Sequence, residues 1–176
     1  ANCGWRLNEA ILAARSMEDL PRFYFEQPCS TMEECIEVRK HTNLPMIYDE
    51  IVSDVATLIR AVREGGAGGF NLKISKVGGL TKAKQMRDLC QELGLQITVE
   101  DTWGGDIVTA TSAHVAASTK ERSLLSVSFM NDWIREHIAG HKPRSKNGFG
   151  HVPTGPGLGI DVNLSLLEEP LFSVGA

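Results

Sequence analysis

Short apolar runs alternate with longer segments in which apolar residues recur every three or four positions. The short runs predict five strands, at 23–25, 46–48, 70–74, 96–99 and 124–128. The longer segments have the spacing of amphipathic helices and predict helices over about 7–17, 31–41, 54–64, 80–93 and 106–118. Strand and helix therefore alternate along most of the chain, which is typical of an α/β fold with parallel strands.

Capping and breaking residues mark the ends of these elements. Thr31 begins a capping-box pattern, and Ser53 or Asp54 is placed to cap the next helix. The glycine-rich run 65–69 is expected to end that helix before the third strand. After Gly140 the chain is rich in glycine and proline. We therefore expect a β/α part over 1–140 and an irregular tail over 141–176 that packs back on it.

Each of the first four apolar runs ends in a charged residue. These residues are Glu26, Asp49, Lys73 and the pair Glu100-Asp101, at steps of 23, 24 and 27 residues. The rhythm fits either an open doubly wound sheet or a (β/α)8 barrel, and both place ligands at the carboxyl ends of the strands. A barrel is favoured because it directs every strand end toward one pocket.

Five strands are fewer than the eight that close such a barrel. The prediction is therefore a partial (β/α)8, TIM-like barrel whose first strands lie before Ala1. Taken alone, the sheet would expose two strand edges, which favours aggregation or self-pairing.

The strand-end carboxylates suggest a metal site. Glu26 and Asp49 should point into one mouth, where two carboxylates repel unless a proton or cation lies between them. Oxygen ligands suit a hard cation, most plausibly Mg²⁺. The alternative is a pair of solvated carboxylates at the ends of two strands.

Lys73 is the candidate acid/base. Burial lowers the pKa of a lysine, and a lysine with a lowered pKa can accept a proton. The alternative is a salt bridge to Glu50 or Asp49, which is compatible with catalysis. Lys76 is expected to be a solvated loop charge or a partner of Glu50.

A third group, Asp101, Trp103 and Asp106, could receive a cationic part of a ligand through charge pairing and cation–π contact. The alternative is that Asp106 caps a helix and Trp103 packs at the rim.

Three other motifs lack the context that their function needs. The glycine run at 66–69 precedes a strand, whereas a dinucleotide-binding fingerprint follows one. His137 and His141 are four residues apart, but the sequence offers no acidic or cysteine partner to complete a zinc set. His114 lies among small residues on a predicted helix and is expected to be packed.

Bulk properties narrow the class of protein. The chain has 176 residues and a formal net charge of −4 without a basic stripe, which argues against a nucleic-acid partner. No apolar run reaches 18 residues, so we expect no membrane span, and we expect no signal peptide. The four cysteines lack metal or redox spacing and are expected to be small core residues in a reducing, cytoplasmic compartment.

The motifs together resemble the enolase superfamily, in its mandelate racemase and muconate lactonizing enzyme branch. The resemblance covers almost the whole chain. It rests on Glu26-Gln27-Pro28, Asp49-Glu50, the segment Lys73-Ile74-Ser75-Lys76-Val77-Gly78-Gly79 and the tail Pro156-Gly157-Leu158-Gly159. It implies a barrel with an N-terminal capping domain, Mg²⁺ held by three strand-end carboxylates, and two lysines on opposite faces of a small carboxylate substrate. It also implies a full-length protein that forms a homo-oligomer.

Within the superfamily, Glu26-Gln27-Pro28-Cys29 and the segment Glu100-Asp101-Thr102-Trp103-Gly104-Gly105-Asp106 look most like cis-3-hydroxy-L-proline dehydratases, with proline-betaine epimerases close behind. The resemblance implies Lys73 as acid/base, Glu26 and Asp49 as metal ligands, and supporting roles for Glu50, Lys76 and Asn2. It implies dehydration of an imino acid or, alternatively, racemisation or epimerisation of an amino acid or betaine.

One departure from the pattern matters. Ala1-Asn2 matches the last two positions of the family's Asp-x-Asn, so its Asp would precede the chain, and the Lys-x-Lys strand and capping domain are also absent from the sequence. A catalytically incomplete fragment or pseudoenzyme is therefore a third expectation.

Overall fold

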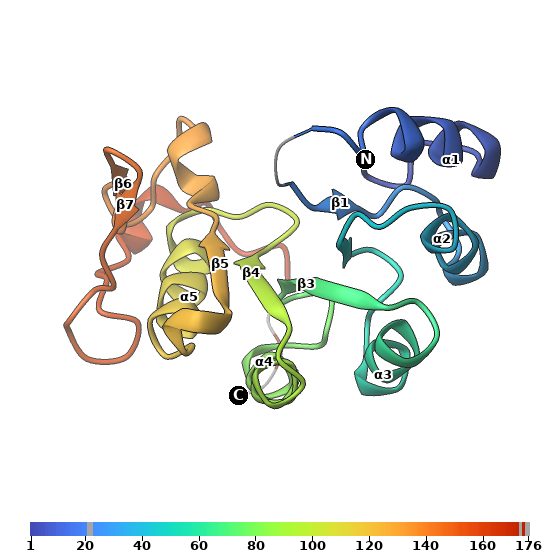
Figure 1. The fold of residues 1–176 in the computed structure, drawn as a ribbon. Coiled ribbons are helices and arrows are strands. Elements are labelled where there is room, and N and C mark those ends of the chain that lie inside the picture. Colours follow the sequence, from blue (N-terminus) through green and yellow to red (C-terminus); the bar gives the residue numbers. More distant parts are fainter. Residues whose placement is uncertain (21–22, 173, 175–176) are drawn as a thin grey trace.

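The computed structural model describes residues 1–20, 23–172 and 174, and contains one five-stranded parallel sheet with helices along one side (Figure 1). The strands are β1 (Phe25–Glu26), β2 (Met46–Tyr48), β3 (Ala67–Lys73), β4 (Gln96–Glu100) and β5 (Leu124–Val127). The helices are α1 (Leu7–Ser16), α2 (Met32–Arg39), α3 (Val55–Arg63), α4 (Leu80–Glu92) and α5 (Asp106–Ala117), with short 3-10 turns η1 (Glu121–Ser123), η2 (Met130–Trp133) and η3 (Leu164–Leu166).

The order of the strands in the sheet distinguishes between the two expected architectures. Their spatial order is β1-β2-β3-β4-β5, the same as their order in the chain, and every pair is parallel. A doubly wound sheet reverses direction at a switch point, and this sheet has none. In Figure 1 the helices form an outer arc around the strands, which is the arrangement of part of a (β/α)8 barrel.

Side chains alternate between the two faces of the sheet. On β3, Phe70 and Leu72 are fully buried against the helices, in one core that extends from α1 to α5. Asn71 and Lys73 take the opposite, concave face, because successive residues of a strand point to opposite sides. The concave face thus carries the polar residues of the strand ends.

The structure corrects the predicted start of the third strand. β3 begins at Ala67, so the last glycines of the run 65–69 belong to the strand and not to the helix stop. A Cβ on Gly69 would lie 2.9 Å from the carbonyl oxygen of Gln96 and 3.1 Å from Cγ1 of Ile47. Gly69 therefore allows three neighbouring strands to approach closely. The first strand also differs, since β1 begins at Phe25 instead of residue 23.

The helix starts follow the predicted capping chemistry at two places. The hydroxyl of Thr31 accepts the N–H of Glu34 at 3.2 Å, and Asp54 accepts the N–H of Thr57 at 2.8 Å. No helix in the described part of the chain is long and apolar enough to cross a membrane.

The tail after Gly140 is more regular than predicted. It contains an antiparallel hairpin of β6 (Ser145–Lys146) and β7 (Phe149–Gly150). Further along, the backbone N–H of Asn163 donates to the carbonyl of Ile138 at 2.7 Å. The ring of His114 on α5 lies 3.1 Å from the carbonyl oxygen of Leu158, so this histidine binds the tail.

Asp106 anchors the segment that leads into the tail. It is the first residue of α5 and is fully buried, and Gly105 takes the capping position. Its carboxylate accepts the side-chain amide of Asn131 at 2.9 Å and the backbone N–H of Ala139 at 2.8 Å, and it pairs with His137 at 3.1 Å. Asp106 thus anchors protein groups of the following segment, which is neither the ligand contact nor the helix capping considered for it from the sequence.

The two spaced histidines each pair with an acid, which their spacing in the sequence did not indicate. His137 pairs with Asp106, and His141 pairs with Asp132 at 2.6 Å. The two imidazole rings stack with centroids 4.1 Å apart. The acids lie 31 and nine residues before their histidines, and these contacts fasten the tail to η2 and α5.

Candidate functional site

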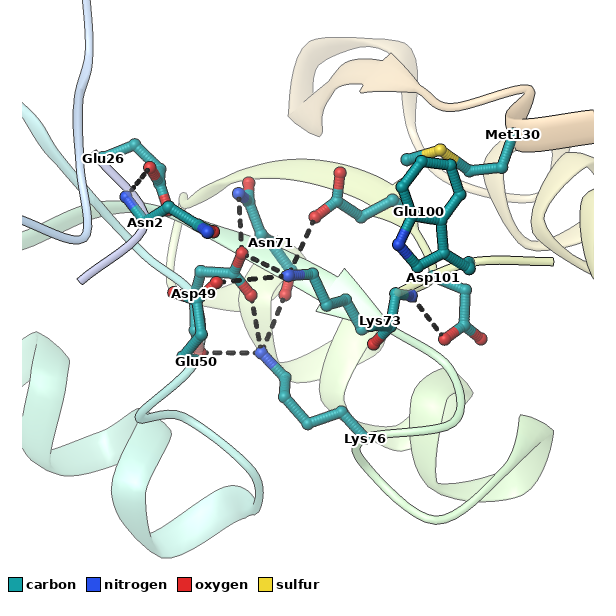
Figure 2. Close-up of a pocket in the computed structure, with 12 residues that line it drawn as sticks. Asn2, Glu26, Asp49, Glu50, Asn71, Lys73, Lys76, Glu100, Asp101 and Met130 are labelled. Carbon is teal, nitrogen blue, oxygen red and sulfur yellow. Dashed lines mark hydrogen bonds and ion pairs between the residues drawn. The ribbon is translucent and has the colours of Figure 1, made fainter. Parts of the chain in front are cut away.

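A cleft of about 630 Å³ lies at the carboxyl ends of the five strands. Five carboxylates and two lysines line it, together with Asn2, Asn71, Thr102, Trp103 and Met130. The charged residues are Glu26, Asp49, Glu50, Glu100, Asp101, Lys73 and Lys76 (Figure 2). The cleft is therefore acidic overall, which suits a cationic ligand.

Three carboxylates come together on one side of this cleft. One oxygen from each of Glu26, Asp49 and Glu50 lies within 4.8 Å of the other two. Glu26 ends β1, and Asp49 and Glu50 directly follow β2, so the parallel pairing of these strands brings them together. The sequence placed Glu26 and Asp49 in one mouth, as found, and assigned Glu50 only a supporting position.

Asp49 is the most enclosed of the three acids. It is buried, and its backbone N–H donates to Oε1 of Gln27 at 2.9 Å. Burial raises the pKa of the Asp49 carboxyl, but hydrogen bonds and charges from Lys73 and Lys76 outweigh this and hold the pKa below its usual value. Asp49 therefore carries a negative charge at neutral pH.

Lys73 is at the centre of the charged cluster. Its Nζ lies 2.7 Å from Oδ2 of Asp49, 3.4 Å from Oε1 of Glu50 and 3.6 Å from Oε1 of Glu100. The lowered pKa expected from burial is wrong for this structure. Burial does lower the pKa of Lys73, but the three carboxylates, Asp49 first, reverse the effect and raise it above the usual value.

Lys76 has a different partner from the one predicted. It lies in the loop after β3, and its Nζ donates to Oδ1 of Asp49 at 2.8 Å and to the Asp49 carbonyl at 2.7 Å. The predicted partner was Glu50. The loop folds back toward β2, which brings the ammonium group to the residue before Glu50.

Asp101 lies on the wall of the cleft, where its oxygens already accept hydrogen bonds. They accept the N–H of Ser75 at 3.0 Å, the Ser75 hydroxyl, and the N–H of Thr102 at 2.7 Å. These bonds hold the loop that carries Lys76. Trp103 is 64% exposed at the mouth of the cleft.

Asn2 lies beside the first carboxylate. Its backbone N–H is 3.2 Å from Oε2 of Glu26, and the amino group of Ala1 is 2.5 Å from the same oxygen. This segment therefore lies at the edge of the acidic cluster, and the supporting role of Asn2 stays a prediction.

Four lining residues had no role assigned from the sequence, and two of them, Asn71 and Glu100, are polar groups close to the charged cluster. Asn71 donates from Nδ2 to Oδ2 of Asp49 at 3.4 Å, and Glu100 accepts the Ser128 hydroxyl at 3.4 Å. Burial and the charge of Asp49 raise the pKa of Glu100, which Lys73 offsets in part. The position of Asn71 could have been predicted, because it lies two residues before Lys73 on one strand and so shares its face. Glu100 ends the next strand, where it is the register partner of Lys73.

The sequence profile of the enolase C-terminal domain-like family matches residues 1–166. The chain belongs to this family. The resemblance inferred from its motifs is thereby confirmed, and the partial barrel of Figure 1 is the fold that this membership implies.

Individual relatives point to the same superfamily. The chain is 45% identical to a cis-3-hydroxy-L-proline dehydratase of Roseibium aggregatum, over 97% of this chain and 46% of that protein. It is 29% identical to an o-succinylbenzoate synthase of Bacillus subtilis, over 96% of this chain and 46% of the other. The chain thus spans about half the length of these relatives.

Solved structures extend the comparison to three dimensions. A mandelate racemase/muconate lactonizing enzyme from Roseovarius nubinhibens superimposes with a TM-score of 0.91 and 37% identity, over 98% of this chain and 46% of that one. An enolase superfamily member from the same organism, complexed with magnesium, gives a TM-score of 0.92 and 28% identity, over 98% and 47% of the two chains.

The acidic cluster of this enolase-family chain has donors that fit a hard divalent ion. Two oxygens bound to one hard divalent ion lie at most about 4–5 Å apart, since metal–oxygen distances are about 2.0–2.1 Å for Mg²⁺ and about 2.3–2.6 Å for Ca²⁺. The separation of at most 4.8 Å between the three carboxylate oxygens is within this span. All three donors are oxygens, and each belongs to a different side chain.

Proposed function

We propose that this chain forms the catalytic strand-end part of an enolase-superfamily lyase that removes the proton α to a carboxylate. The proposed reaction is dehydration of cis-3-hydroxy-L-proline or a related imino acid. The observation that carries the proposal is the convergence of Lys73 with Glu26, Asp49 and Glu50 in one cleft. The identity with a protein named for this reaction supports it.

We propose Mg²⁺ as the cofactor, held by Glu26, Asp49 and Glu50. When bound, the ion would hold the substrate carboxylate and stabilise the negative charge that develops on it as the α-proton leaves. Asn71 and Lys76 would orient Asp49 from outside the coordination sphere, since both donate to its carboxylate.

Lys73 takes the α-proton on its Nζ, for which it must be a neutral amine. The carboxylates that raise its pKa include the proposed metal ligands. Neutralisation of their charge by a divalent cation therefore lowers the pKa of Lys73 toward the range of a useful base. The Cα–H electron pair moves toward the carboxylate and then returns to form the Cα–Cβ double bond, while the 3-hydroxyl accepts a proton from solvent and leaves as water.

Dehydration is favoured over epimerisation because the chain is 45% identical to a protein named for dehydration of cis-3-hydroxy-L-proline. Trp103 and Asp101 remain candidates for contact with the cationic ring nitrogen.

The chain is shorter than the relatives that it matches, which affects where the activity should reside. Because the chain spans about half of its relatives, we propose that turnover requires a longer protein that contains this chain. The chain alone should bind Mg²⁺ weakly and turn over no substrate.

The test is an assay of such a full-length protein with Mg²⁺ against cis-3-hydroxy-L-proline, trans-4-hydroxy-L-proline and proline betaine. We expect loss of cis-3-hydroxy-L-proline with release of water. Inversion of proline betaine without water loss would instead support the epimerase, and inactivity on the whole panel would support the pseudoenzyme.

A further inference from the structure

Lys76 occupies one of the two oxygens of the Asp49 carboxylate. Its Nζ lies 2.8 Å from Oδ1 and also 2.7 Å from the carbonyl oxygen of the same residue. The other oxygen, Oδ2, faces Lys73 at 2.7 Å and Asn71 at 3.4 Å (Figure 2). The two oxygens of Asp49 therefore have separate partners.

The position of Lys76 is fixed by its loop. Asp101 holds Ser75 through the backbone N–H at 3.0 Å, and the N–H of Val77 donates to the carbonyl of Lys73 at 3.2 Å. The Lys76 side chain is only 16% exposed, and its ammonium group lies 5.2 Å from the centre of the Phe70 ring. Both neighbours of Lys76 in the chain are thus anchored by backbone hydrogen bonds.

Both oxygens of Asp49 face an ammonium group, so an ion must take the place of one of them. Lys76 is retained on Oδ1 because it also donates to the Asp49 carbonyl and its loop is anchored, so an ion that displaces Lys73 takes Oδ2 alone. This difference matters for the choice of ion. Ca²⁺ takes six to eight oxygens and often binds both oxygens of a carboxylate, whereas Mg²⁺ prefers a strict octahedron with about one oxygen from each carboxylate.

We infer that Lys76 makes Asp49 a one-oxygen ligand and thereby sets the preference of the acidic cluster for Mg²⁺ over Ca²⁺. Lys76 is thus a positioning residue that acts through Asp49. The inference rests on the proposed function in one respect, namely that Glu26, Asp49 and Glu50 bind a divalent ion.

The experiment measures metal binding directly, in a full-length protein that contains this chain. Bound Mn²⁺ is followed by the loss of the electron paramagnetic resonance signal of free Mn²⁺, and Mg²⁺ and Ca²⁺ are titrated as competitors. In Lys76→Met we expect the affinity for Ca²⁺ relative to Mg²⁺ to rise about tenfold, the scale on which outer partners of metal ligands act.

Two variants separate this effect from a change of charge. Lys73→Met removes the same charge from the Oδ2 side, so it should tighten both ions and leave their ratio unchanged. Lys76→Arg keeps donors on Oδ1 and should keep the ratio of the native chain. If Lys76→Met fails to fold, Lys76→Gln replaces it, because the shorter polar side chain withdraws from Asp49. We expect the same rise in the affinity for Ca²⁺ relative to Mg²⁺.

The outcomes that overturn the inference are distinct from those that overturn the proposed metal site. An unchanged ratio of Ca²⁺ to Mg²⁺ affinity in a folded Lys76→Met or Lys76→Gln variant that still binds Mn²⁺ overturns the role of Lys76 alone. A native full-length protein that binds none of the three ions overturns the metal site and the inference with it.

Discussion

The ammonium nitrogen of Lys73 lies 2.7 Å from Oδ2 of Asp49, across the junction between β3 and the end of β2. The candidate base and a candidate metal ligand are thus in direct contact. Because the Lys73 side chain is 13% exposed and projects into the cleft, replacing it changes the chemistry of the cleft more than the packing of the core.

Lys73→Met should abolish turnover in the full-length protein and leave its fold intact. Loss of a general acid/base typically lowers the rate by about 10²–10⁴-fold. The measurement is kcat for water loss from cis-3-hydroxy-L-proline, with far-UV circular dichroism as the check on folding. Lys84→Met, at an exposed pair with Asp88, is the matched control and should keep native activity. Near-native turnover in folded Lys73→Met would reject Lys73 as the base.

Gln27→Leu should destabilise the chain and weaken metal binding together. Gln27 is fully buried, accepts the N–H of Asp49 at 2.9 Å and donates to the carbonyl of Cys29 at 2.8 Å. Each buried partner left without a hydrogen bond costs about 1–3 kcal/mol. Urea unfolding measures the free energy of unfolding, and titration with Mn²⁺ measures the metal affinity of the acidic cluster.

Gln96→Leu is the control for that variant, because Gln96 makes one exposed bond to the carbonyl of Arg122. It should change the free energy of unfolding by less than about 0.5 kcal/mol. Equal losses of stability in the two variants would show that Gln27 has no special part in holding Asp49.

The order of the strands in the sheet could be predicted because each strand is a short apolar run, and the first four runs end in a charged residue. Glu26, Asp49 and Lys73 occupy the predicted edge for that reason. The ion-pair partners of these charged side chains could not be predicted from the pattern of strands. The pKa of Lys73 depends on how many carboxylates surround it, and Glu100 reaches it through the register of β3 with β4.

Contacts formed by loops and the tail were the hardest to foresee. The partner of Lys76 depends on how the loop after β3 folds, and that conformation is set by Asp101 and Ser75 from two different strand ends. The pairs that His137 and His141 make with Asp106 and Asp132 likewise arise from tertiary packing, which sequence spacing does not encode.

Asp101→Asn should mainly lower the free energy of unfolding, whereas Trp103→Ala should mainly raise KM. Asp101 accepts N–H groups from Ser75 and Thr102, so the amide should lower the free energy of unfolding by about 1–3 kcal/mol. Trp103 is 64% exposed, and its loss should raise KM with a stability change within about 0.5 kcal/mol. A raised KM with unchanged stability in Asp101→Asn would instead assign Asp101 to substrate binding.

The tail contacts of Asp106 should make stability depend on acidic pH. Burial raises the pKa of this carboxyl, but bonds from Asn131, Ala139 and His137 outweigh it and lower the pKa below the ordinary value of 3.8. The unfolded chain therefore binds the proton more readily than the folded one. The stabilisation is complete above the unfolded pKa and is lost as the pH falls through the folded pKa.

Urea unfolding of a full-length protein that contains the chain, between about pH 2.5 and 7, measures this effect, and the loss of stability should begin as the pH falls below the unfolded pKa. Asp106→Asn should be less stable at pH 7 and should lose less stability on acidification. If the variant and the native chain show parallel pH profiles, Asp106 does not contribute to the acid sensitivity.

The central claim is that Lys73 and the three neighbouring carboxylates remove the α-proton of cis-3-hydroxy-L-proline with the help of Mg²⁺. The most direct measurement is ¹H NMR of this substrate with the full-length protein and Mg²⁺, compared with the same sample after chelation by EDTA. The account predicts that the α-proton and 3-hydroxymethine signals of the substrate disappear as the dehydrated product forms, and that EDTA stops the reaction. Unchanged substrate with Mg²⁺ present, or equal turnover after chelation, would contradict it.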